Sequence, residues 1–116
     1  MSEQFLIDDG YTIDGTIARE PGIHPALAFT YRPALAAERN AHLKAAQDPA
    51  KRHKVDAALI AEHVQSWSVA DRKGGALDKP TLALAERLQP TLMVRLVDVI
   101  LGYSASGEEG DDAKNS

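Results

Sequence analysis

Hydrophobic and polar positions alternate in the first third of the chain. The alternation is clearest over residues 11–19 and 26–32, which are also rich in β-branched and aromatic residues. This pattern is typical of strands with one buried face. The sequence allows a tight hairpin at Asp14-Gly15 or a longer first strand that returns as residues 26–32. The proline- and glycine-rich segment 20–25 favours the second arrangement.

Helical patterning follows Pro33, which suits a first helical turn because it has no N–H to satisfy. Residues 34–46 are nearly all strong helix formers. Asp48-Pro49 predicts a break, since proline disfavours helical geometry in the residue before it. A second helix is expected over residues 50–65. Its apolar stripe, which predicts a core-facing side, comprises Val55, Leu59, Ile60, His63, Val64 and Trp67.

Two further helices are predicted in the C-terminal third. Asp78 is a good N-cap for one of them, with Pro80 in its first turn. The last helix is expected over residues 90–101 and ends at Gly102, a C-terminal cap. A helix this apolar must be covered, either by the rest of the fold or in part by another subunit. Its apolar residues are Leu92, Met93, Leu96, Val97, Val99, Ile100 and Leu101.

These elements predict an α+β fold that is mostly helical, with a short N-terminal β-hairpin followed by about four helices. Residues 1–103 are expected to form a single small domain, and residues 104–116 a disordered acidic tail. Trp67, the single tryptophan, lies where the second helix runs out. It is expected to pack at the seam between the first half of the domain and the C-terminal helices.

Composition narrows the function classes. The 116 residues carry a formal net charge of −4, so no domain-wide basic field attracts nucleic acid. The chain has no cysteine, which excludes disulfides, thiolate metal sites and cysteine nucleophiles. No apolar run is long enough for a membrane span, and the N-terminus lacks a secretory signal pattern. A cytoplasmic protein is the expectation.

Candidate chemistry is sparse. The four histidines are separated by 18, 11 and 10 residues, whereas two ligands on one helix face need a spacing of three or four. We therefore expect no metal site and no cofactor. His63 is expected to be packed in the core with one ring nitrogen hydrogen-bonded. No serine or acid stands at a spacing that would complete a nucleophilic constellation, so an enzyme is not expected.

The order of motifs resembles the small tail assembly chaperones of long-tailed phages and prophages. An aromatic strand runs through Arg-Pro into a helix with Glu-Arg, here Phe29 to Arg39. A helix then leads to a tryptophan and an acid-and-glycine turn. Two short helices follow, joined at Leu88-Gln89-Pro90-Thr91-Leu92, and the pattern ends in Ile100-Leu101-Gly102. The resemblance covers residues 11–102.

The resemblance implies a non-enzymatic protein that coats the tape-measure protein and keeps it soluble while tail-tube subunits assemble around it. Such proteins are commonly helical and multimeric, so a homo-oligomer is compatible with it. The partner-binding side chains are expected on the over-wide apolar face of the last helix and around the tryptophan. They are Trp67, Leu92, Met93, Leu96, Val97, Ile100 and Leu101.

Two alternatives stay open. A small nucleic-acid-binding or regulatory protein would use the basic cluster Lys51, Arg52, His53 and Lys54, although a solvated helix surface explains that cluster more simply. A structural tail-completion protein would share the chemistry of the chaperone. It would differ in remaining in the finished virion.

Overall fold

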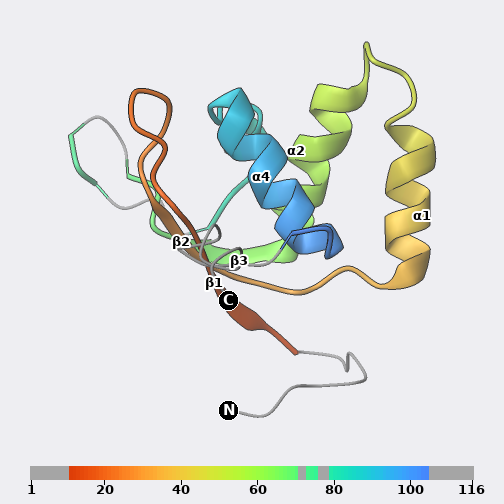
Figure 1. Ribbon diagram of the computed structural model, residues 1–116, viewed down its shortest axis with the longest axis horizontal. Helices are drawn as coiled ribbons and strands as arrows, with labels where there is room; N and C mark the ends of the chain where they lie inside the picture. The colour runs from red at the N-terminus through yellow and green to blue at the C-terminus, as the bar shows by residue number, and fades with distance from the viewer. Residues whose placement is uncertain (1–10, 71–72, 76–78, 105–116) are drawn as a thin grey trace, which may run out of the picture.

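The computed structural model describes residues 11–70, 73–75 and 79–104. Within these residues the chain forms a mixed α+β fold, which confirms the predicted fold class (Figure 1). The predicted acidic tail lies outside the described residues, apart from Ser104. The elements are, in order, β1 (Ile13–Ile17), β2 (Leu27–Tyr31), α1 (Ala36–Ala45), α2 (Arg52–His63), β3 (Val64–Trp67), α3 (Leu82–Ala85) and α4 (Pro90–Leu101).

The sheet is antiparallel with the strand order β1-β2-β3. β1 pairs with β2 from Ile13 opposite Tyr31 to Ile17 opposite Leu27. The longer returning strand is therefore correct, and the tight hairpin at Asp14-Gly15 is wrong. Residues on one face of β2 are buried while those between them are more exposed, as expected for a sheet covered on one side.

The third strand corrects the predicted extent of the second helix. That helix ends at His63, and Val64–Trp67 continues as β3, paired with β2. The register shifts between Thr30 and Tyr31, so Gln65 is an extra residue in β3. Because of this bulge, Val64 and Trp67 are both buried although they are three residues apart. A spacing of three is a helical signal, which explains the wrong prediction.

The helix ends follow their local sequence signals in most places. The break at Asp48-Pro49 is confirmed, because α1 ends at Ala45 and α2 begins at Arg52. α4 has its predicted bounds, and Gly102 caps it with a left-handed φ of 87°. The start of α1 is one exception, because Leu35 is its N-cap and Pro33 precedes the helix instead of lying in its first turn. The helix after the glycine turn is another. Thr81 caps α3, so Pro80 precedes this helix instead of lying in its first turn, and Asp78 lies outside the described residues.

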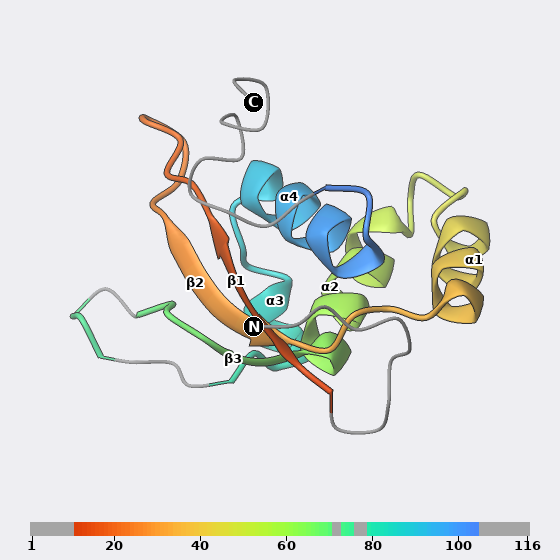
Figure 2. The same cartoon turned by 60° about the horizontal axis from the view of Figure 1, so that its bottom comes forward.

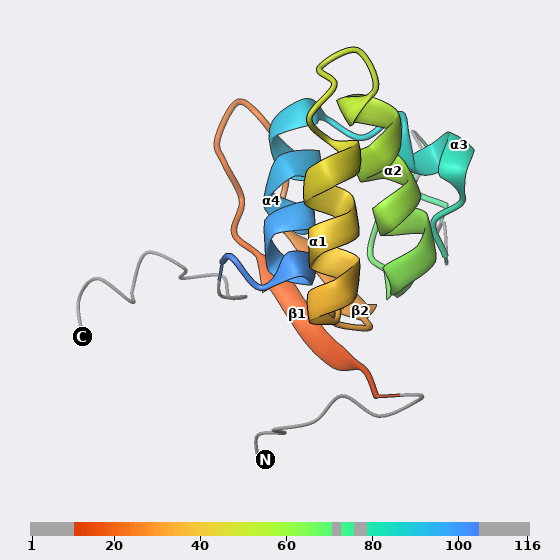
Figure 3. The same ribbon diagram turned by 90° about the vertical axis from the view of Figure 1, so that its right-hand side faces the viewer.

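The helices lie on one side of the sheet, with α4 beside the β1-β2 hairpin and α1 farthest from it (Figure 2). α2 and α4 are neighbours, and α3 packs against α2 (Figure 3). The core forms between the buried sheet face and these helices, and its largest fully buried side chains are Ile60, Leu96, Ile100, His63 and Val64.

Replacing Trp67 with alanine tests the contribution of β3 to this core. The side chain is only 7% exposed and stands opposite Phe29 in the sheet. Trp67→Ala should lower the free energy of unfolding by about 3–5 kcal/mol, because a large cavity replaces the ring. Urea denaturation measures the change, and Ser66→Ala, at an exposed position of the same strand, is the control. A loss below about 0.5 kcal/mol for Trp67→Ala would contradict the assignment.

Candidate functional site

The seven side chains predicted to contact a partner are all in the core. They are between 0% and 7% exposed: Trp67, Leu92, Met93, Leu96, Val97, Ile100 and Leu101. The wide apolar face of α4 is therefore covered by this chain itself, and the premise that it lies open is wrong. On α4 the large apolar side chain that does reach the surface is Val94, which is 46% exposed.

A hollow of about 410 Å³ lies between α1 and α4. Two of the predicted residues, Val97 and Leu101, contribute to its lining. Leu43 from α1 and Tyr103 from the end of α4 line it as well, and each is 49% exposed. This volume is within the range of ~300–1,000 Å³ of typical binding clefts. Accessible apolar surface is thus present, but along α1 and the end of α4. We call this hollow the α1–α4 groove; its other lining residues are His42, Ala46, Gln47, Pro49, Arg52 and Asp98.

His42, in the lining of this groove, forms a buried polar pair with Asp56. The Nε2 of His42 is 2.7 Å from Oδ1 of Asp56, and the two side chains are 6% and 5% exposed. Because a carboxylate only accepts, Nε2 carries the proton. Among the described residues, Nδ1 of His42 has no hydrogen-bond partner. Burial raises the pKa of nearby Asp98, and Asp56 raises it further, while Arg52 lowers it.

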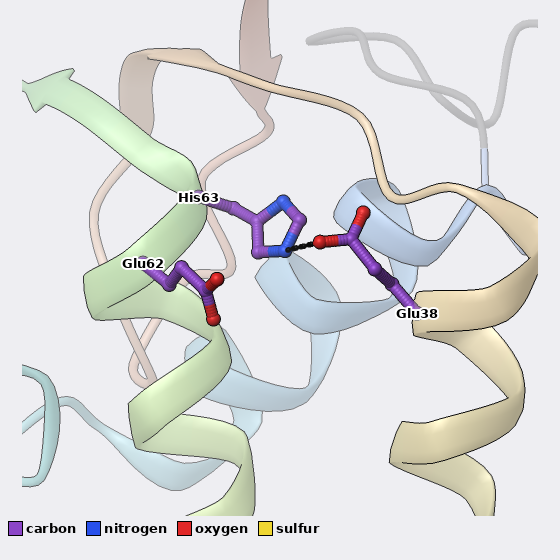
Figure 4. Close-up of side chains that lie close together, drawn as sticks. All are labelled: Glu38, Glu62 and His63. Carbon is purple, nitrogen blue, oxygen red and sulfur yellow. Dashed lines mark ion pairs between the residues drawn. The ribbon is translucent and has the colours of Figure 1, made fainter.

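A second polar cluster surrounds Arg32, in the linker between β2 and α1. Figure 4 shows three members of this cluster, Glu38, Glu62 and His63. The Arg32 guanidinium donates two hydrogen bonds to the Glu38 carboxylate, of 3.1 and 3.0 Å. The same guanidinium lies 3.3 Å from Nε2 of His63 and 3.9 Å from the Glu62 carboxylate. The hydrogen bonds from Arg32 lower the pKa of Glu38, the backbone N–H of Leu35 lowers it further, and burial opposes them.

Glu38, Glu62 and His63 also have the spacing of a metal site, since their ligand atoms lie within 4.8 Å of one another. The spacing of the histidines does not reveal this group, because Glu38 comes from a different helix. However, a cation already stands among these side chains, namely the Arg32 guanidinium. A metal ion would have to displace this guanidinium. The arrangement is therefore better explained as an ion-pair cluster than as a metal site.

His63 joins the same linker through its backbone and its ring. Its Nδ1 lies 2.7 Å from the Arg32 carbonyl oxygen, which only accepts, so Nδ1 donates. In return the Arg32 N–H donates to the His63 carbonyl at 2.9 Å. The ring is 1% exposed. The structure thus confirms His63 as a packed, hydrogen-bonded core histidine.

The linker and the first turn of α1 also hold the end of α4. The N–H of Ala34 donates to the Ile100 carbonyl at 3.0 Å, and Nε of Arg39 donates to the Leu101 carbonyl at 2.9 Å. The last carbonyls of a helix have no partner within the helix, so these donors satisfy them. The positive charge of Arg39 also suits the negative end of the helix dipole.

A comparable histidine–arginine pair joins α4 to the hairpin. Nδ1 of the buried His24 donates to the Pro25 carbonyl at 2.8 Å. Nη1 of Arg95 lies 3.1 Å from Nε2 of His24, and its Nη2 lies 3.3 Å from the Glu20 carboxylate. Arg95 looked like an ordinary polar position on a helix face. Its partner is 71 residues away, and no local pattern marks the contact.

Comparison with models of known protein families, with curated proteins and with solved structures gave no match for this chain. Within the part of the chain that the structure describes, no helix combines the length and apolar character needed to cross a membrane. A functional assignment therefore depends on the groove, the polar clusters and the resemblance of the motifs.

Replacing Glu38 with glutamine should reveal its ion pair as a pH-dependent loss of stability. The pKa of Glu38 is lowered on folding, so its contribution is present above the unfolded value near 4.5 and is lost as the pH falls through the lower folded value. At pH 7, Glu38→Gln should lower the free energy of unfolding by about 1–3 kcal/mol. Below about pH 4 the difference from the unsubstituted protein should shrink.

Glu62→Gln is the matched control, because Glu62 belongs to the same cluster but its side chain is 68% exposed. Its effect should stay within about 0.5 kcal/mol at any pH. Urea denaturation at several pH values measures both variants. A pH-independent loss for Glu38→Gln would show that its charge is not what stabilises the fold.

Proposed function

We propose that this protein is a non-enzymatic phage tail assembly chaperone, which binds the tape-measure protein in the host cytoplasm while tail-tube subunits assemble. The observation that carries the proposal is the α1–α4 groove, with half-exposed Leu43 and Tyr103 in its lining. A chaperone of a long amphipathic partner needs accessible apolar surface on a stable frame.

The resemblance to tail assembly chaperones supports the proposal, because its motifs lie at structural joints of the fold. The segment Phe29 to Arg39 spans the end of β2, the linker and the first turn of α1. The joint at Pro90 begins α4, and Gly102 ends it. These motifs are thus at the connections between the sheet and the helices and at the ends of α4, as expected for a structural pattern rather than a reaction centre.

The non-enzymatic part of the proposal is supported by how the polar side chains are used. Both ring nitrogens of His24 and of His63 face partners within the fold. The carboxylate of Glu38 is occupied by Arg32 and by the Leu35 N–H. These three side chains are therefore engaged in holding elements together.

Nucleic-acid binding is the second candidate. Its support is that Lys51, Arg52, His53 and Lys54 are all exposed at the start of α2. The net charge of −4 counts against it, and α2 lies beside α1 and α4 instead of projecting alone. We rank it below the chaperone for these reasons.

Co-expression with the tape-measure protein of the same phage or prophage tests the proposal. Because bound apolar segments cannot aggregate, the soluble fraction of the tape-measure protein should rise severalfold, and the two proteins should co-purify. The tape-measure protein expressed alone is the control. Unchanged solubility and no co-purification would reject the chaperone. Recovery of this protein in finished virions would favour a tail-completion role instead.

A further inference from the structure

We propose that the α1–α4 groove is a docking site for an amphipathic helix with leucine-like side chains on its apolar face and acidic residues beside the start of α2. The inference deepens the proposed function and rests on it for the source of that helix, a segment of the tape-measure protein. The new elements are the binding surface, which is the α1–α4 groove, and the apolar and acidic character of the helix that binds there.

The apolar surface of the groove is formed by side chains from α1 and from the end of α4. Leu43 comes from α1 and Tyr103 follows α4, and both are 49% exposed. Between them the lining includes Val97 and Leu101, which are 4% and 2% exposed. Two half-exposed apolar side chains across a recessed apolar surface suit an occupant that inserts its own apolar side chains.

The walls of the groove determine the backbone conformation of the occupant. α1 and α4 are helices, whose backbone groups are already paired within each helix. They offer no strand edge to which an extended peptide could add. An occupant must satisfy its own backbone hydrogen bonds, and a helix does so.

The accessible charge at the α2 end of the groove is positive. Arg52 lines it with a side chain that is 59% exposed, although its Nε lies 3.9 Å from Oδ2 of Asp56, and Lys51, His53 and Lys54 beside it are also exposed. The acids there offer less free charge, because Asp56 is 5% exposed and bound to His42. Asp98 is partly buried. Charge complementarity therefore favours acidic residues on the occupant.

Two synthetic helical peptides test the inference. Both carry leucine at helical spacings i, i+3 or i+4, and i+7, and one has glutamate where the other has lysine. Fluorescence anisotropy with labelled peptide and the full chain measures their affinities. The acidic peptide should bind saturably, and the basic peptide about tenfold more weakly or not at all.

Matched variants locate the site. Leu43→Ser should weaken binding of the acidic peptide by about tenfold, whereas Leu82→Ser, at an equally exposed leucine on α3 outside the groove lining, should leave it unchanged. Arg52→Gln should reduce the preference for the acidic peptide, and Arg87→Gln, with the same loss of charge outside the lining, should not. Circular dichroism confirms that each variant is folded.

Equal affinities for the two peptides, no saturable binding of the acidic one, or equal losses for Leu43→Ser and Leu82→Ser would overturn the inference. Repeating the co-expression with Leu43→Ser separates it from the proposed function. If unsubstituted protein and Leu43→Ser both keep the tape-measure protein soluble, the chaperone stands and the groove is the wrong site. If the unsubstituted protein does not keep the tape-measure protein soluble, the proposed chaperone function is rejected. The peptide measurements then still decide whether the groove binds an acidic helix.

Discussion

The paired hydrogen bonds between Arg32 and His63 are the contact on which the domain depends. They connect the end of β2 to the junction of α2 and β3, through one backbone bond of 2.9 Å and one ring bond of 2.7 Å. Two residues later, Ala34 bonds the end of α4. One short linker therefore satisfies carbonyls at the ends of two helices and fixes where α1 begins. Its own N–H groups and carbonyl are satisfied in return, and Pro33 between them has no N–H that needs a partner.

This arrangement explains why the apolar face of α4 is not a free surface and why a groove exists beside it. The sheet and α2 cover the face that the sequence assigned to a partner, so its apolar side chains stabilise the fold of the single chain. α1 is tied to the rest by its first turn and by the His42–Asp56 pair. The remaining space between α1 and α4 is partly open, and it carries the apolar and positive features that support a role in binding an acidic amphipathic helix.

Sequence reasoning succeeded where the signal was local. α4 has its predicted bounds because Pro90 and Gly102 fix its ends through their own backbone preferences. The sequence-based prediction was wrong where the structure depends on pairing between strands. The bulge in β3 gave Val64 and Trp67 a helical spacing, and only the partner strand reveals it. The Arg32 cluster and the groove were not predictable either, because their residues are brought together by the fold over separations such as the 31 residues from Arg32 to His63.

The state of the His63 ring is the most direct test of this account. If the ring bonds the Arg32 carbonyl inside the core, a nitrogen–proton correlation spectrum of labelled protein will show a proton on Nδ1 that exchanges slowly with solvent. That signal should weaken when the linker is disturbed, as in Arg32→Ala. A ring protonated only on Nε2, or an Nδ1 proton that exchanges as fast as in a free histidine, would contradict the claim that this contact holds the linker, the sheet and the helices together.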